Sequence, residues 1–497
     1  MTYSRRTVLA GLGAVAASVP GGRGRAQEAS RDVILTDATV VTMDDARRAF
    51  SSGYVWIRGT QIHRVGAMSG LGPVPGEATV RQLGGGLIMP GLINCHTHLS
   101  NAAVRGLYDE MPLDVWFSKG MWPVLEELDG EAGAAGAALS LLELMTGGVT
   151  TSVSGEFGTP RPDLPDGVLT AVTRSGMRAV VSRMTVDSAD ESSPSQFIPA
   201  PYRETPERAA EEVRRLQRAY ASDRITVAPE ALGVLRCTPA MIEAMHALAV
   251  DTDTPFLMHA ASSPDELDES RRRFGHGSVA ELERLGVLGP RTLLAHAVWL
   301  DNEEIDVLAR RQTGISHNPV SNAYYASGIA RLGAMLAAGV RVGLGTDGAS
   351  TNNGQNVWET MKVAMLMQKE AQSDASFGSA ELALELMTRG GAAALHMDDV
   401  IGSLEPGKRA DFIVIDTDRV SLSPGQTLIS NLVYSNDPGA VRDVYVDGEL
   451  VVRDGVHRSL DRDAVIADAT AAFDRILRKT GLDSYIRDRT TWDWDDG

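Results

Sequence analysis

Short apolar runs alternate with amphipathic stretches through the middle of the chain. Eight of the runs have the length and the apolar content of buried strands, and most are followed by a pattern of helical period. The expected strands are residues 92–98, 149–154, 179–184, 226–230, 256–259, 292–296, 314–317 and 342–347. The expected helices include residues 131–145, 209–221, 239–249, 302–311 and 354–368. Repeated strand-then-helix units of this kind predict an α/β fold, a (β/α)8 or TIM barrel.

The two ends of the chain have a different pattern, with short strands punctuated by Gly and Asp and few helical stretches. We therefore expect a small β-sandwich built jointly from residues 30–85 and 400–455. The barrel would occupy residues 86–399 between them, and residues 456–497 would form a C-terminal helix and an acidic tail.

The first 26 residues have the pattern of an export signal. Arg5 and Arg6 form a twin-arginine pair, an apolar stretch follows at 9–19, and a small-x-small site ends at Ala26. The apolar stretch is too short to cross a bilayer as a helix. Residues 1–26 are thus expected to be a cleaved twin-arginine signal peptide, so that the protein is exported folded, is periplasmic or secreted, and keeps no membrane anchor.

Composition and charge limit the kinds of partner that the protein can bind. The formal net charge of −18 argues against nucleic acid and anionic membranes, because both repel an acidic surface. Two cysteines, Cys95 and Cys237, cannot make a disulfide framework. These numbers indicate a globular protein with a large core and say little about a small-molecule substrate.

Metal-binding side chains gather at the ends of the expected strands. His96 and His98 lie two apart in the first strand, so both face the same way. His259, His296 and Asp347 end three later strands. Imidazoles with one carboxylate suit zinc or another borderline divalent ion. Such an ion lowers the pKa of a bound water toward about 7, Asp347 can accept the water proton, and His296 can polarise the group under attack.

Several segments resemble the amidohydrolase superfamily. They are Met89–His98, Leu294–Asp301, Ser316–Asn322, Gly343–Gly348 and Gly402–Asp411. They are similar to the branch that contains triazine chlorohydrolases and aminohydrolases, S-adenosylhomocysteine deaminases, and 8-oxoguanine and guanine deaminases. The resemblance implies a homo-oligomer whose barrel holds one metal ion. Zinc is the first choice, with iron(II) or manganese(II) as alternatives, and the implied ligands are His96, His98, His259 and Asp347, with His296 beside them.

One position departs from the pattern of the deaminases in this branch. There, a glutamate three residues after the strand-five histidine passes a proton to the leaving amine, whereas this chain has Ser262. Glu230, at the end of the fourth strand, could replace it as an acid/base or serve as a ligand. Asp265 or Glu266 could fold back into the site. Alternatively, the reaction needs no separate acid because Asp347 returns the proton that it took from water.

Aromatic residues near the expected site predict a flat, stacking pocket. Trp116, Phe117 and Trp122 follow the first strand, and Tyr324 and Tyr325 follow the seventh. The residues that we expect to bind substrate are Trp122, Ser262, His317, Asn322 and Tyr325.

These features predict a metal-dependent hydrolase that cleaves a C–N bond in a cyclic or aryl amide, lactam, carbamate or related heterocycle. Its catalytic residues would be Asp347, His296 and Glu230. The alternative is an aminohydrolase, or deaminase, of a purine-, pterin- or triazine-like heterocycle with Glu230 as the proton shuttle. A second alternative is a non-catalytic metal-binding protein on the same scaffold.

Overall fold

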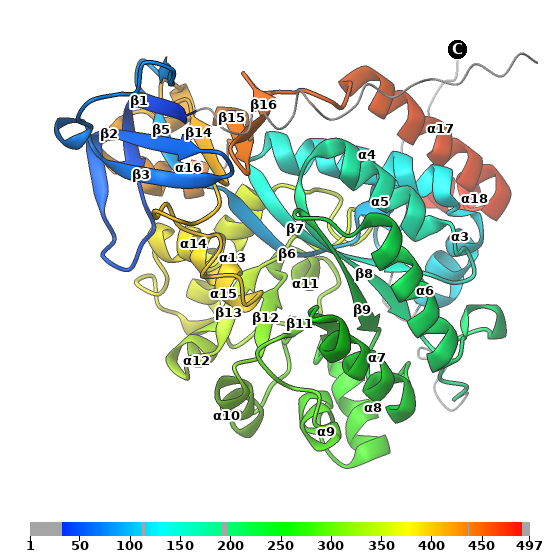
Figure 1. The fold of residues 1–497 in the computed structure, drawn as a ribbon. Helices are drawn as coiled ribbons and strands as arrows, with labels where there is room; N and C mark the ends of the chain where they lie inside the picture. The colour runs from blue at the N-terminus through cyan, green and yellow to red at the C-terminus, as the bar shows by residue number, and fades with distance from the viewer. Residues whose placement is uncertain (1–31, 112–114, 191–196, 436, 490–497) are drawn as a thin grey trace, which may run out of the picture.

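The structure is a computed structural model that describes residues 32–111, 115–190, 197–435 and 437–489. The expected signal peptide and the last eight residues of the expected tail lie outside the described residues. Most of the described chain belongs to two sheets and the helices packed around them (Figure 1).

Eight parallel strands form the expected barrel, and each pairs with its neighbour in chain order. They are β6 (Leu92–Thr97), β7 (Val149–Phe157), β8 (Arg178–Thr185), β9 (Ile225–Ala231), β10 (Phe256–Ala260), β11 (Thr292–His296), β12 (Gly314–His317) and β13 (Arg341–Leu344). The first and last strands meet where the Asp347 N–H donates to the His96 carbonyl at 3.0 Å. The predicted TIM barrel is confirmed, and the strand bounds differ from the predicted ones by at most three residues.

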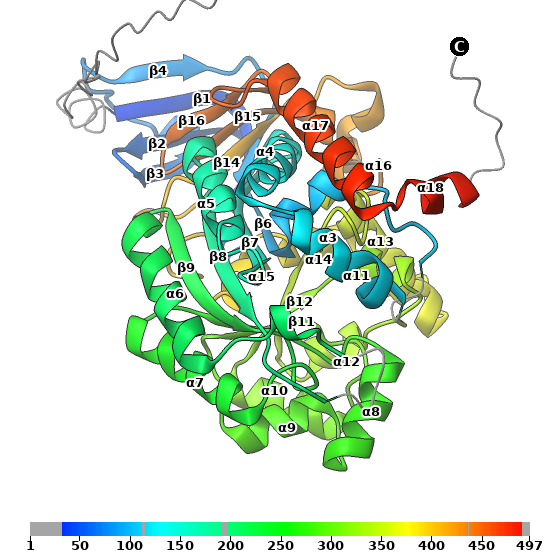
Figure 2. The same ribbon diagram turned by 90° about the vertical axis from the view of Figure 1, so that its right-hand side faces the viewer.

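Helices surround the barrel (Figures 1 and 2). They are α4 (Gly130–Thr146), α5 (Leu164–Ser175), α6 (Pro206–Tyr220), α7 (Pro239–Thr252), α8 (Pro264–Phe274), α9 (Ser278–Leu285), α10 (Asn302–Arg311), α12 (Leu332–Ala337), α13 (Val357–Gln372), α14 (Ala380–Leu386) and α15 (Arg389–Ala394). Local signals set their ends. Helix α10, for example, begins with a capping box in which Asp301 and Glu304 each bond the other's backbone N–H. Helix α6 buries Ala209, Val213 and Leu216, which share one face at helical spacing.

The connections above the barrel contain shorter elements. They are η2 (Leu99–Val104), η3 (Trp116–Met121), α3 (Trp122–Glu127) and α11 (Pro319–Tyr324). The first three follow β6 and the last follows β12, so they border the end of the barrel where the expected ligands lie.

The two ends of the chain build one nine-stranded sheet beside the barrel, as the sequence predicts for a shared β-rich unit. The N-terminal strands are β1 (Asp32–Val41), β2 (Ala49–Arg58), β3 (Gln61–Ala67), β4 (Thr79–Gln82) and β5 (Leu87–Pro90). The C-terminal strands are β14 (Phe412–Ile415), β15 (Val441–Val446), β16 (Glu449–Arg453) and β17 (Val456–His457). The two sets join through antiparallel pairing of β5 with β14.

A buried arginine ties this sheet to the barrel. Arg178, the first residue of β8, contacts Asp411 at 2.7 Å and Asp447 at 2.5 Å. These contacts lie at the N-terminal ends of the barrel strands. In TIM barrels, residues at this end contribute to stability, whereas the catalytic residues lie at the opposite end.

The chain ends in helices α17 (Arg462–Thr480) and α18 (Asp483–Arg489), after α16 (Leu428–Ser435). Helix α17 lies against α4 (Figure 2), and Arg475 on α17 contacts Asp129 at the start of α4 at 2.5 Å. Within the described ranges, no helix has the length and apolar character to cross a membrane.

Candidate active site

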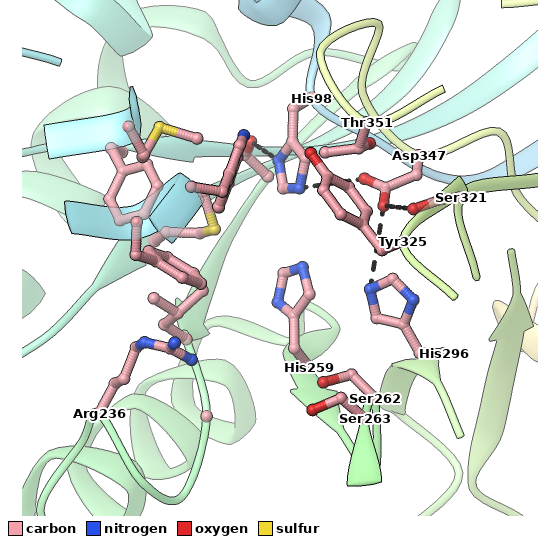
Figure 3. A pocket seen from close by; sticks show the side chains of 18 of the residues that line it. His98, Arg236, His259, Ser262, Ser263, His296, Ser321, Tyr325, Asp347 and Thr351 are labelled. Atoms are coloured by element: carbon pink, nitrogen blue, oxygen red, sulfur yellow. Dashed lines mark hydrogen bonds and ion pairs between the residues drawn. The ribbon is translucent and has the colours of Figure 1, made fainter. Parts of the chain in front are cut away.

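The five expected cluster residues converge at the C-terminal end of the barrel. Figure 3 shows four of them, His98, His259, His296 and Asp347. His96 lies in β6, His98 follows it directly, His259 lies in β10, His296 ends β11, and Asp347 comes three residues after β13. The Asp347 carboxylate is 3.5 Å from Nε2 of His96, 3.4 Å from Nε2 of His98 and 4.0 Å from Nε2 of His296. Parallel strands put their carboxyl ends on one face, which is why residues so distant in sequence meet here.

The backbone is held in an unusual conformation at two of these residues. His296 has a φ of 79° and Asp347 a φ of 60°, a region that residues other than glycine seldom adopt. Hydrogen bonds hold the Asp347 carboxylate in place, from Ser321 Oγ at 2.6 Å and from the Gly348 N–H at 2.7 Å. Burial opposes its charge, but the contact with His96 and the nearby imidazoles of His98 and His296 keep the pKa of Asp347 well below its usual value. The carboxylate is therefore ionised and fixed in direction.

The cluster fits a divalent metal ion. One donor atom from each of His96, His98 and Asp347 lies within 4.8 Å of the others, and the same holds for His96, His259 and His296. Nε2 of His96 is buried and has no hydrogen-bond partner among the described residues, although a buried polar atom ordinarily has one. Burial lowers the pKa of His96 to about 3, so the imidazole is neutral and free to donate a lone pair.

Other groups orient these imidazoles. Nδ1 of His98 lies 2.6 Å from the Gly155 carbonyl, which accepts a hydrogen bond from that nitrogen and leaves Nε2 facing Asp347. Nδ1 of His296 lies 3.0 Å from Oδ1 of Asn322. Partners of this kind select the tautomer and the ring direction of a metal ligand or an electrophile.

A cavity with an aromatic wall opens beside the cluster (Figure 3). Of the residues expected to bind substrate, Ser262, Asn322 and Tyr325 line it, and so do Trp116 and Phe117. Two others are not among the lining residues. Trp122 packs behind the wall against Phe117, Phe157 and Tyr202, with ring centroids 4.8 to 6.1 Å apart. His317 is buried at the end of β12, and burial lowers its pKa to about 4.

The three carboxylates considered as replacements for a glutamate at position 262 lie in different places. Glu230 is buried at the end of β9, does not line the cavity, and has Oε1 3.3 Å from Nδ1 of His259. Glu266 and Asp265 both line the cavity. Glu266 folds back from α8 and accepts hydrogen bonds from the Ala261 N–H at 2.8 Å and from the N–H and hydroxyl of Ser262 at 2.8 and 2.6 Å.

Two cavity residues were missed from the sequence. Glu156 accepts hydrogen bonds from Ser100 Oγ at 2.5 Å and Ser154 Oγ at 2.6 Å, and burial raises its pKa. It escaped notice because the strand was predicted to end at residue 154, whereas β7 continues to Phe157. Arg236 lines the cavity with its guanidinium carbon 3.9 Å from the Phe117 ring centroid, and burial lowers its pKa to about 10. No local motif marks this arginine.

Fold and site together define a class, a barrel hydrolase with a candidate metal centre. The sequence matches the profile of the amidohydrolase family over residues 87–451. A 5'-deoxyadenosine deaminase of Methanothermobacter thermautotrophicus is 37% identical over 399 residues, which are 80% of this chain and 90% of that protein. A 5-methylthioadenosine/S-adenosylhomocysteine deaminase of Nitratidesulfovibrio vulgaris is 36% identical over 444 residues, 89% of this chain and 96% of that protein.

Solved structures have the same fold. An adenosine deaminase of Xanthomonas campestris, with bound zinc, superposes with a TM-score of 0.82 at 27% identity, covering 90% of this chain and 99% of that one. An atrazine chlorohydrolase of Arthrobacter aurescens, in complex with zinc, gives 0.79 at 25% identity, covering 89% and 100%. The chain belongs to the amidohydrolase family and is a hydrolase that acts on carbon–nitrogen bonds other than peptide bonds.

Proposed function

We propose that this protein is a metal-dependent aminohydrolase that removes the amino group of an adenine-like heterocycle and releases ammonia. The observation that carries the proposal is the complete cluster of four histidines and Asp347 beside an aromatic cavity. Support comes from the two similar proteins, at 36% and 37% identity, that are named as deaminases of 5'-substituted adenosines. The deaminase alternative from the sequence thus has more support than amide or lactam hydrolysis.

The residues take the following roles in this proposal. His96, His98, His259 and Asp347 would hold one zinc ion, which would supply the activation of a water and the polarisation of the substrate. Asp347 accepts the water proton, since its carboxylate is ionised and fixed by Ser321. His296, beside the cluster, would polarise the group under attack. Trp116, Phe117 and Tyr325 supply flat surfaces for the heterocycle.

The leaving amine needs a proton, and Ser262 cannot supply one alone near neutral pH. The Ser262 hydroxyl, however, donates to Glu266 at 2.6 Å, and both residues line the cavity. The Glu266 carboxylate is therefore linked to the cavity wall at position 262 by its hydrogen bond with the Ser262 hydroxyl. The second candidate function is hydrolysis of a cyclic or aryl amide, in which Asp347 itself returns the proton. The serine at position 262 is the observation that favours it.

The test is turnover of zinc-loaded protein on a mixed panel, with ammonia and ring or acyl cleavage scored separately. The panel holds 5'-deoxyadenosine, 5'-methylthioadenosine, adenosine, guanine, an aminotriazine, a lactam and an N-acyl aryl amide. Ammonia from an adenine compound supports the proposal, whereas cleavage without ammonia supports the second candidate. Asp347→Asn removes the proton acceptor and should lower kcat by at least about 100-fold, the lower end for a general base. If it keeps full kcat, the role of Asp347 is wrong.

The location and assembly of the protein also remain proposals. We infer from residues 1–26 that the enzyme is exported folded by the twin-arginine route and acts in the periplasm or outside the cell. Replacing Arg5 and Arg6 together by lysine should leave the full-length precursor in the cytoplasmic fraction. We further expect a homo-oligomer, which light scattering on the mature protein would detect.

A further inference from the structure

Glu230 lies in a site of its own inside the barrel, behind the metal cluster. Its side chain is 2% exposed. Oε1 is 3.3 Å from Nδ1 of His259, and Oε2 accepts a hydrogen bond from the Ser182 hydroxyl. Nδ1 of His259 is buried and makes no hydrogen bond with any described residue, so the Glu230 carboxylate at 3.3 Å is the acceptor placed beside it. One carboxylate oxygen therefore faces the imidazole while the other is anchored on β8.

The neighbouring strand leaves room for this carboxylate. A Cβ at Gly155 on β7 would lie 2.6 Å from Oε2 of Glu230, which is closer than real Cβ atoms approach. Gly155 is also the residue opposite Ser182 in the β7–β8 register. Three adjacent strands thus supply the space, the anchor and the acid, an arrangement that fixes the Glu230 side chain in one position.

This position suits neither a proton shuttle nor a metal ligand. Glu230 is not among the residues that line the cavity, so a substrate amine does not reach it. In the described part of the chain, it belongs to neither group of three donor atoms that could share an ion. What it does contact is the ring nitrogen of His259.

We propose that Glu230 is a positioning residue for the metal ligand His259. Its carboxylate lies where it can accept a hydrogen bond from Nδ1–H, which would favour the tautomer whose Nε2 carries the lone pair and would hold the ring in its cluster with His96 and His296. The inference rests on the metal centre of the proposed function but not on the reaction. Zinc affinity without substrate therefore tests it separately from deamination.

The experiment measures zinc affinity of the resting protein by competition with a coloured chelator. Glu230→Ala should bind zinc about 10- to 100-fold more weakly, the usual loss when a carboxylate behind a histidine ligand is removed. Glu230→Gln keeps an acceptor oxygen and should lose less. The matched control is Glu266→Gln, which alters a carboxylate on the cavity wall and should leave the affinity unchanged. Circular dichroism confirms that each variant is folded.

Three results would overturn the inference. One is a folded Glu230→Ala protein that binds zinc as tightly as the wild type. Another is a zinc stoichiometry of two ions in the wild type and one in Glu230→Gln, which would show that Glu230 is itself a metal ligand. The third is unchanged zinc affinity in Glu230→Gln with loss of one limb of the pH profile of kcat, which would make Glu230 a proton shuttle. If the wild type binds zinc and Glu230→Ala binds it weakly, failure to deaminate any substrate would refute the proposed function alone.

Discussion

Adding a single methyl group at Gly155 should push Glu230 away from His259. The new Cβ would lie 2.6 Å from Oε2 and 3.2 Å from Cδ and Oε1 of Glu230. Alanine fits the strand conformation of Gly155, so the effect is steric and not a matter of backbone strain. The carboxylate cannot yield easily because the Ser182 hydroxyl donates a hydrogen bond to the same oxygen, Oε2. Overpacking of a tight core costs about 1–3 kcal/mol, so Gly155→Ala should lower the unfolding free energy by that amount.

The assay is denaturant unfolding of zinc-free protein in a double-mutant cycle with Glu230→Ala. Once the carboxylate is gone, the methyl group meets no Glu230 atoms, and Gly155→Ala should cost about 0.5–3 kcal/mol less than in the wild type. Gly233→Ala is the control, because its Cβ would meet only the His259 carbonyl at 3.4 Å, an ordinary contact. The reasoning is refuted if Gly155→Ala is as stable as the wild type or costs the same with and without Glu230.

The remaining predictions concern contacts away from the cavity. Arg178→Met leaves Asp411 buried without a guanidinium, whereas Asp447 keeps its contact with Arg224. Chemical denaturation should show a loss of about 3–5 kcal/mol, and a loss below about 1 kcal/mol would contradict the role given to Arg178. The hydrogen bond from Arg475 holds the pKa of Asp129 at about 2. Because the folded-state pKa is depressed, this contact stabilises α17 above about pH 4 and fades as the pH falls toward 2. The protection factors of the α17 amides, which correct for the pH dependence of intrinsic exchange, should therefore fall across that window in the wild type and not in Asp129→Asn.

The sequence was sufficient to bring together the four histidines and Asp347, because the fold determines where they lie. An apolar run of strand length marks each barrel strand, and the chemistry of a TIM barrel gathers at one end of those strands. His96, His98, His259 and His296 lie within or directly after their strands. Asp347 lies three residues beyond β13, yet its contact with the first strand through the His96 carbonyl closes the same ring.

What the sequence could not supply is the direction of side chains that depend on neighbouring strands. Glu230 ends a strand, as predicted, but Gly155 and Ser182 on other strands decide that it faces His259 and not the cavity. Glu156 was missed because the polar residues of β7 interrupt the apolar pattern and its partner Ser100 is near only in the fold. A cluster of aromatic residues likewise does not reveal which members border a cavity, and Trp122 lies behind the wall.

The most direct test of the account is the product formed from a 5'-substituted adenosine by the zinc-loaded enzyme in water enriched in oxygen-18. We predict that the amino group leaves as ammonia and that one heavy oxygen takes its place on the ring, as mass spectrometry would detect. An unchanged purine together with labelled ring-opened or acyl-cleaved products from the amide compounds would contradict the deaminase proposal.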